Sequence, residues 1–152
     1  MENSVTGVDR EAAIRQLGAA YQGVARAQRR LRGRDAMQPG RLTAPQVNLI
    51  GPLAENGPMS SGQLAEAAGL TPATTTHMLD QLAVAGVVER NRQEHDKRVV
   101  ITSLTDTGVA MLTSRVDEMN EAWGHALAEF DAKQMETAAE VISAICKFVD
   151  DL

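Results

Sequence analysis

The chain has 152 residues, 43% of them hydrophobic but only 3% aromatic, and a formal net charge of −5 at pH 7. This length allows one compact core with helical extensions, and no run of about 18 apolar residues predicts a membrane span. The first residues lack the features of a signal peptide and the single cysteine cannot form an internal disulfide, so we expect a cytoplasmic protein.

The charge is distributed unevenly along the chain. Residues 10–41 hold eight arginines against two acids, whereas residues 105–152 hold three cations against ten acids. Such asymmetry predicts distinct charged faces instead of a uniformly acidic surface. A nucleic-acid partner would then be bound by a few placed cations, and we expect Arg41, next to a predicted helix, to reach a phosphate.

Long helices are predicted at both ends of the chain, after residues 1–8, which we expect to be flexible. Apolar residues recur at spacings of three and four in three segments, residues 9–32, 105–130 and 131–152. Such narrow stripes fit helices that pack at nearly parallel crossings. The short core between them cannot bury all three stripes. We therefore predict a homodimer, with residues 9–41 and 105–152 as its helical dimerisation region.

A further helix is predicted over residues 43–56, because Thr43 and Gln46 are spaced as a capping box. Pro52 should kink or split this helix, since proline removes a backbone donor and clashes with the preceding turn. The proline would either shape a cavity or only accommodate packing, and we favour packing.

Residues 60–86 predict a helix-turn-helix. Ser60 and Gln63 form a second capping box, and Gly69 suits the left-handed position that ends a helix. Thr71 then caps the next helix, which has proline at its first position and ends at Gly86. Helical spacing predicts the buried positions, which are Leu64, Ala67 and Ala68 in the first helix and Thr75, Met78, Leu79 and Leu82 in the second.

The other side of the second helix presents hydrogen-bonding side chains without charge. These are Thr74, Thr76, His77 and Gln81. An uncharged polar face on the first turns fits a recognition helix that enters the major groove of DNA. The alternative is an ordinary pair of helices packed against another element.

A two-stranded hairpin, or wing, is predicted next, with β-branched residues at 87–88 and 99–101 and a polar loop over residues 91–98. We expect Arg98 to enter a minor groove, oriented by a charge-assisted hydrogen bond that its guanidinium donates to Asp96. Phosphate contacts are expected from Arg92 and Lys97. The alternative is a solvated hairpin whose surface ion pair has little energetic value.

Five motifs follow one another along the chain: Leu42-Thr43-Ala44-Pro45-Gln46, Thr71-Pro72-Ala73-Thr74, Gly86-Val87-Val88-Glu89-Arg90, Asp96-Lys97-Arg98 and Leu104-Thr105-Asp106-Thr107-Gly108. In this order and spacing, they resemble the MarR (multiple antibiotic resistance regulator) family of bacterial winged-helix repressors. With the long flanking helices, the resemblance covers nearly the whole chain. It departs at His77 and Gln81, where the family usually has a cation, so this recognition helix is less basic.

The fold class we predict is mainly α (α+β), a winged helix-turn-helix core over residues 42–104 with long N- and C-terminal dimerisation helices. The resemblance implies a dimeric, sequence-specific transcriptional regulator, a repressor, that binds a pseudo-palindromic operator in double-stranded DNA. The expected DNA-binding residues are Arg41, Thr71, Ala73, Thr74, Thr76, His77, Gln81, Arg92, Asp96, Lys97 and Arg98.

The resemblance also implies a small-molecule effector, because family members bind lipophilic or phenolic compounds where the winged core meets the dimer helices. The residues expected to line this site are Tyr21, Val24, Asn48, Leu49, Pro52, Met111, Leu112 and Arg115. Arg115 would bind a carboxylate, and Tyr21 or Asn48 a hydroxyl. The alternative is that these side chains only fill the junction.

No motif favours catalysis. The chain has no glycine-rich phosphate loop, paired-carboxylate motif or nucleophile elbow, and its three histidines lie on different elements without metal-ligand spacing. We therefore expect neither an enzyme, nor a cofactor, nor a metal site. The alternative function is a winged-helix module for protein contacts without its own operator, which a salt-dependent shift of a two-fold DNA site would distinguish.

Overall fold

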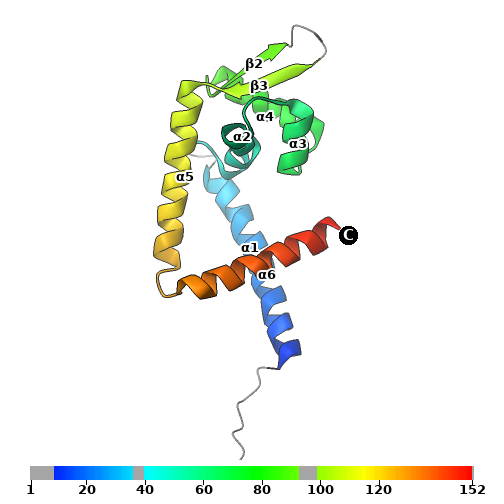
Figure 1. Ribbon diagram of the computed structural model, residues 1–152, viewed down its shortest axis with the longest axis vertical. Coiled ribbons are helices and arrows are strands. Elements are labelled where there is room, and N and C mark those ends of the chain that lie inside the picture. The colour runs from blue at the N-terminus through cyan, green and yellow to red at the C-terminus, as the bar shows by residue number, and fades with distance from the viewer. Residues whose placement is uncertain (1–8, 36–39, 93–98, 152) are drawn as a thin grey trace, which may run out of the picture. The chain divides into compact units, whose positions relative to one another are not determined.

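The computed structural model describes residues 9–35, 40–92 and 99–151 (Figure 1). Residues 1–112 and 113–152 form two compact units. The chain is mainly helical with one small antiparallel sheet, so the predicted fold class is confirmed. The elements are α1 (Arg10–Asp35), α2 (Ala44–Asn56), β1 (Met59–Ser60), α3 (Ser61–Ala68), α4 (Pro72–Val84), β2 (Val88–Arg92), β3 (Val100–Leu104), α5 (Asp106–Ala126) and α6 (Ala132–Asp150). No described helix has the length and apolar character needed to cross a membrane.

Local hydrogen bonds determine where the helices begin. In three capping boxes, the cap side chain accepts the N–H of a glutamine three residues on, and the glutamine Oε1 accepts the N–H of the cap. The pairs are Thr43 with Gln46, Ser60 with Gln63, and Asp131 with Gln134. Thr71 caps α4 by accepting the N–H of Thr74 at 3.2 Å, and Gly69 ends α3 with a φ of +61°. The caps and the glycine predicted around α2, α3 and α4 are confirmed.

Helix α2 is continuous through Pro52, so the prediction that the proline splits it is wrong. Proline leaves the carbonyl of Asn48 without its usual donor, but Asn48 is exposed, where solvent can satisfy that carbonyl. The buried side of the helix carries Val47, Leu49, Ile50 and Leu53. Burying each such side chain contributes about 1.5–3 kcal/mol, which outweighs one lost hydrogen bond.

The core of the first unit lies between α2, α3, α4 and the sheet. Its fully buried side chains include Leu49, Ile50, Leu64, Leu79, Leu82 and Val87. Thr75 is also fully buried on α4, as predicted, and Met78 packs at the edge of this core. On α3 the expectation for Ala67 is wrong: it is exposed, whereas Ala65 is buried, because the short helix turns its Leu64–Ala65 side toward the core.

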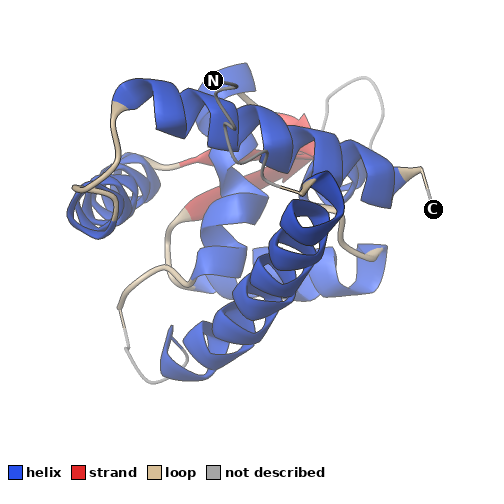
Figure 2. Ribbon diagram, turned by 90° about the horizontal axis from the view of Figure 1, so that it is seen from below, coloured by secondary structure: helices blue, strands red, loops and turns tan. Residues whose placement is uncertain are grey.

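The sheet has three antiparallel strands in the order β1-β3-β2 (red in Figure 2). Strand β2 pairs with β3 from Val88 opposite Leu104 to Arg92 opposite Val100. The predicted loop therefore begins two residues too early, since Asn91 and Arg92 belong to the strand. The third strand, β1, was not predicted, because two residues are too few to show a period of two. Residues 93–98 of the predicted loop lie outside the described residues.

The first turn of α5 is hydrogen-bonded to the two residues that precede β2. The hydroxyl of Thr105 donates to the carbonyl oxygen of Gly86 at 2.6 Å and accepts the N–H of Gly108 at 3.0 Å. The backbone N–H of Thr105 donates to the carbonyl oxygen of Val87 at 3.1 Å. At Gly108 the two backbones approach so closely that a Cβ would lie 1.9 Å from the Val87 oxygen. Only glycine fits there without a backbone shift.

Gly108→Ala should therefore lower the free energy of unfolding by about 1–3 kcal/mol, the range for overpacked sites. Gly124→Ala is the matched control on the same helix, since a Cβ at Gly124 meets nothing within 4 Å. That variant should be neutral or stabilising by up to about 1 kcal/mol, because alanine is the better helix former. Urea unfolding followed by circular dichroism measures both, and equal stabilities would contradict the close contact.

Candidate nucleic-acid interface

Helix α4 has one buried and one exposed face. Thr75, Leu79 and Leu82 point into the core, and the opposite face carries Thr74, His77, Gln81 and Val84 at spacings of three and four. Val84 is 91% exposed although it is apolar. Nearer the start of the helix, Thr71, Ala73 and Thr76 are also exposed. The exposed face is therefore polar and uncharged over its first turns and ends in an apolar side chain.

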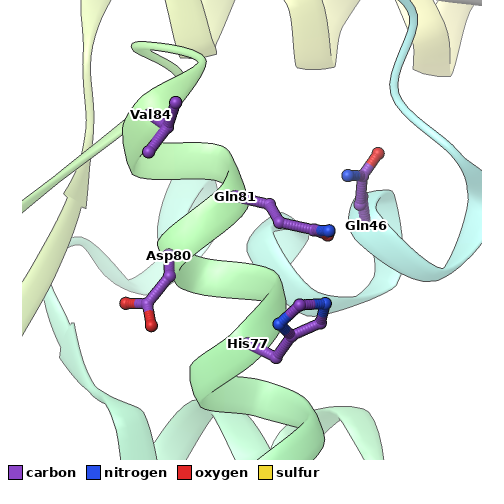
Figure 3. Close-up of a pocket in the computed structure, with 5 residues that line it drawn as sticks. All are labelled: Gln46, His77, Asp80, Gln81 and Val84. Carbon is purple, nitrogen blue, oxygen red and sulfur yellow. The ribbon is translucent and has the colours of Figure 1, made fainter.

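An open hollow of about 550 Å³, here named the α2–α4 hollow, lies beside this face. Its lining residues are Gln46 from α2 and His77, Asp80, Gln81 and Val84 from α4. Figure 3 shows His77 and Gln81 projecting from α4 toward the side where Gln46 lies, whereas the carboxylate of Asp80 points the other way. Side chains from two helices thus present amide and imidazole groups to the same surface.

Asp80 is held by an arginine from the sheet. The Nη1 of Arg90 on β2 donates to Oδ1 of Asp80, and its Nη2 lies 3.5 Å from Oγ of Ser61 on α3. The Arg90 side chain is only 22% exposed, so this ion pair is better shielded than an ordinary surface pair. The pair links α4, β2 and α3, and the guanidinium offsets the one negative charge that borders the hollow.

The structure brings together some of the residues predicted to bind DNA. Thr71, Ala73, Thr74, Thr76, His77 and Gln81 are all exposed on or immediately before α4. Arg92 is exposed at the end of β2, and Arg41 is half-buried beside the core residue Leu42. Asp96, Lys97 and Arg98 lie outside the described residues.

Three lining residues of the hollow were not predicted from the sequence, namely Gln46, Asp80 and Val84. The sequence does mark Gln46, but only as part of a capping box, and that signal concerns α2 alone. Nothing in the spacing of residues 46 and 77 indicates that they share a surface, because the contact depends on how α2 and α4 pack.

The residues predicted to line an effector site differ in their surroundings. Leu49 and Leu112 belong to the buried core, and Met111 packs against it. Tyr21 and Val24 are about half exposed on α1. Asn48 is exposed and Pro52 half-buried on α2. In the second unit Arg115 is buried, with its Nη1 3.5 Å from Oε2 of Glu118.

Two helices joined by a tight turn, with the second one capped and exposed beside a three-stranded sheet, define a winged helix-turn-helix. The family model that matches is the MarR family, over residues 42–100. This segment begins two residues before α2 and ends at the first residue of β3, so it contains the whole exposed face of α4. Over these residues the chain is similar to the MarR family.

The chain is also similar to individual transcriptional regulators, and it shares its fold with solved structures. An uncharacterised HTH-type transcriptional regulator of Bacillus subtilis, YfiV, is 32% identical over 65 residues, which are 43% of this chain and 41% of the relative. The aligned part is thus less than half of YfiV. The HTH-type transcriptional regulator FarR of Neisseria gonorrhoeae is 26% identical over 119 residues, 78% of this chain and 82% of FarR. A mutant of E. coli MarR, solved in complex with operator DNA, shares the fold with a TM-score of 0.70 at 22% identity, covering 90% of this chain and 98% of that one.

Proposed function

We propose that the protein is a sequence-specific DNA-binding transcriptional regulator whose recognition element is α4. The observation that carries the proposal is the exposed row of Thr74, His77 and Gln81 on a helix whose opposite face is anchored in the core. Such a helix presents hydrogen-bonding groups at a rigid, defined position, which base recognition in the major groove requires. The operator complex of the E. coli neighbour supports the same use of the fold.

Each predicted contact has a physical role. A glutamine such as Gln81 can donate to and accept from an adenine edge, and His77 and the threonines can bond to several base edges or phosphates. Arg92 on β2 and Arg41 before α2 would bind phosphates. For the wing we keep the sequence-based proposal, in which Arg98 enters a minor groove with Asp96 orienting it and Lys97 meets a phosphate.

The first test is selection of bound DNA from a random pool at stated salt, followed by titration of the enriched duplex. Gln81→Ala should weaken specific binding by about 1–3 kcal/mol and relax the preference at one base of each half-site. Arg92→Ala should weaken binding to all sequences and reduce the salt slope by about one. Lys147→Ala, a charge removed from α6, is the control and should leave the slope unchanged. If the native chain enriches no sequence, a module for protein contacts becomes the better account.

We also propose that the regulator is a homodimer, assembled through the terminal helices. Each of these helices exposes large apolar side chains in the single chain. They are Ile14, Leu17, Tyr21 and Val24 on α1, Val109, Val116 and Trp123 on α5, and Met135, Ile142, Phe148 and Val149 on α6. Exposed apolar stripes at helical spacing are typical of surfaces that a second subunit covers. A two-fold dimer would present two α4 helices to a pseudo-palindromic site.

Ile142→Glu should convert the dimer into a monomer, because it places a charge in the apolar stripe of α6. Ile142 is 57% exposed in the single chain, so the substitution should not disturb the fold of the subunit. The control is Ser143→Glu, which adds the same charge at the adjacent exposed position. Sedimentation equilibrium gives the masses. A dimer that persists in Ile142→Glu, or in a chain from which residues 131–152 are removed, would contradict the proposal.

We further propose that the protein is a repressor released by a small lipophilic, phenolic or anionic compound. The supporting residues are those of the predicted effector site that are not part of the core: Tyr21, Val24, Asn48 and Pro52, with Met111 at the edge of the core. A compound can release DNA only if it prefers a conformation that does not fit the operator. A tenfold weakening of DNA binding needs about 1.4 kcal/mol of such preference.

Titration of aromatic acids and phenols against the protein–DNA complex tests this effector. Tyr21→Ala and Asn48→Ala should reduce release by the active compound, because each removes a hydrogen-bonding group of the expected site. Both side chains are exposed, so their removal should not affect folding. Glu55→Ala, also exposed on α2, is the control. Release that is equal from all three variants would place the site elsewhere, and a lack of any active compound would favour regulation by protein abundance.

A further inference from the structure

We propose that the α2–α4 hollow binds one backbone phosphate of the DNA, and that the side-chain amide of Gln46 is the donor. This inference rests on the proposed function and adds a contact from α2 to those of α4. Helix α4, which the proposed function places against DNA, carries no lysine or arginine, and the net charge of the chain is −5. A neutral amide that donates to a phosphate would therefore contribute a larger share of the free energy of DNA binding than it would in a basic protein.

The capping box of α2 orients the Gln46 amide. Its Oε1 accepts the N–H of Thr43 at 2.9 Å, and its own backbone N–H donates to Oγ1 of Thr43 at 3.3 Å. The oxygen is thereby committed to the cap, which leaves the two N–H groups of Nε2 as donors. Among the described residues, Nε2 has no hydrogen-bond acceptor. Because the side chain is already held in place, it loses little conformational freedom when it binds.

The surroundings of Gln46 fit an anion that arrives with DNA. Across the hollow lie His77 and Gln81, which the proposed function places against base edges. The groove that admits a recognition helix is bordered by phosphates. The backbone of the same duplex must therefore pass beside this helix, where the Gln46 donor lies. The carboxylate of Asp80 points away from Gln46 and is paired with Arg90, so its repulsion of a phosphate is reduced (Figure 3). The hollow is open, so a continuous strand can cross it.

Two substitutions of Gln46 distinguish its proposed role as a donor to phosphate from its role in the capping box of α2. Gln46→Glu keeps an oxygen that can accept the N–H of Thr43, as glutamate does in many capping boxes, but removes both donors and adds a negative charge. Gln46→Ala removes donor and cap together. Gln134→Glu is the matched control, because Gln134 occupies the same position in the capping box of α6 and does not line the hollow.

The experiment measures binding of the full-length variants to the DNA enriched by selection and to an unrelated duplex. Gln46→Glu should weaken binding to both by roughly tenfold or more, the scale of one hydrogen bond to a charged group, whereas Gln134→Glu should bind like the native protein. A series of duplexes with one methylphosphonate each then locates the contact. In each half-site, we expect one methylphosphonate position that weakens binding of the native protein. The same methylphosphonate should not weaken binding of Gln46→Ala any further, because that variant has already lost the contact.

Native affinity in Gln46→Glu would overturn the phosphate site, as would methylphosphonate losses that are the same in Gln46→Ala and the native protein. The comparison within one variant does not depend on how much of it is folded, so a weakened cap cannot produce the expected pattern. If the native chain binds no DNA at all, the proposed function and the phosphate site both fail. If DNA binds but Gln46 has no effect, only the phosphate site fails.

Discussion

Burial of one face of α4 is the interaction on which the rest of this structure depends. Thr75, Leu79 and Leu82 are almost completely removed from solvent, and they hold the helix against α2, α3 and the sheet. Because a helix repeats every 3.6 residues, burying this face exposes the one that carries Thr74, His77 and Gln81. The packing of the core and the presentation of the candidate interface are thus two consequences of the same burial.

Polar contacts then restrict how the sheet meets that helix. Arg90 pairs with Asp80 and approaches Ser61, which joins β2 to both helices of the helix-turn-helix. Just before β2 begins, the carbonyl oxygens of Gly86 and Val87 accept hydrogen bonds from Thr105, and Gly108 allows α5 to start in contact with the same backbone. A movement of α5 relative to this junction would therefore strain the strand that carries Arg90 and Arg92.

In the proposed recognition of DNA, hydrogen bonds from uncharged side chains would contribute more than attraction by cations. The exposed face of α4 carries amides, hydroxyls and an imidazole, and its one acid is paired. On the proposed function, sequence preference would come from hydrogen bonds at base edges, while long-range attraction would come from a few arginines. A homodimer would double every such contact, which compensates for the small number in one subunit.

Much of this protein follows from short-range sequence signals. The capping boxes at Thr43 and Ser60, the left-handed Gly69 and the period of the buried residues on α4 are local properties, so they predict the helices and the winged helix-turn-helix without knowledge of packing. Three features depended on contacts between distant segments. Strand β1 exists only because β3 lies beside it, and α2 stays continuous at Pro52 because its buried side compensates for the missing bond. Gln46 lines one hollow with residues of α4 only because of how α2 and α4 are placed around a shared core, a relation that no local pattern encodes.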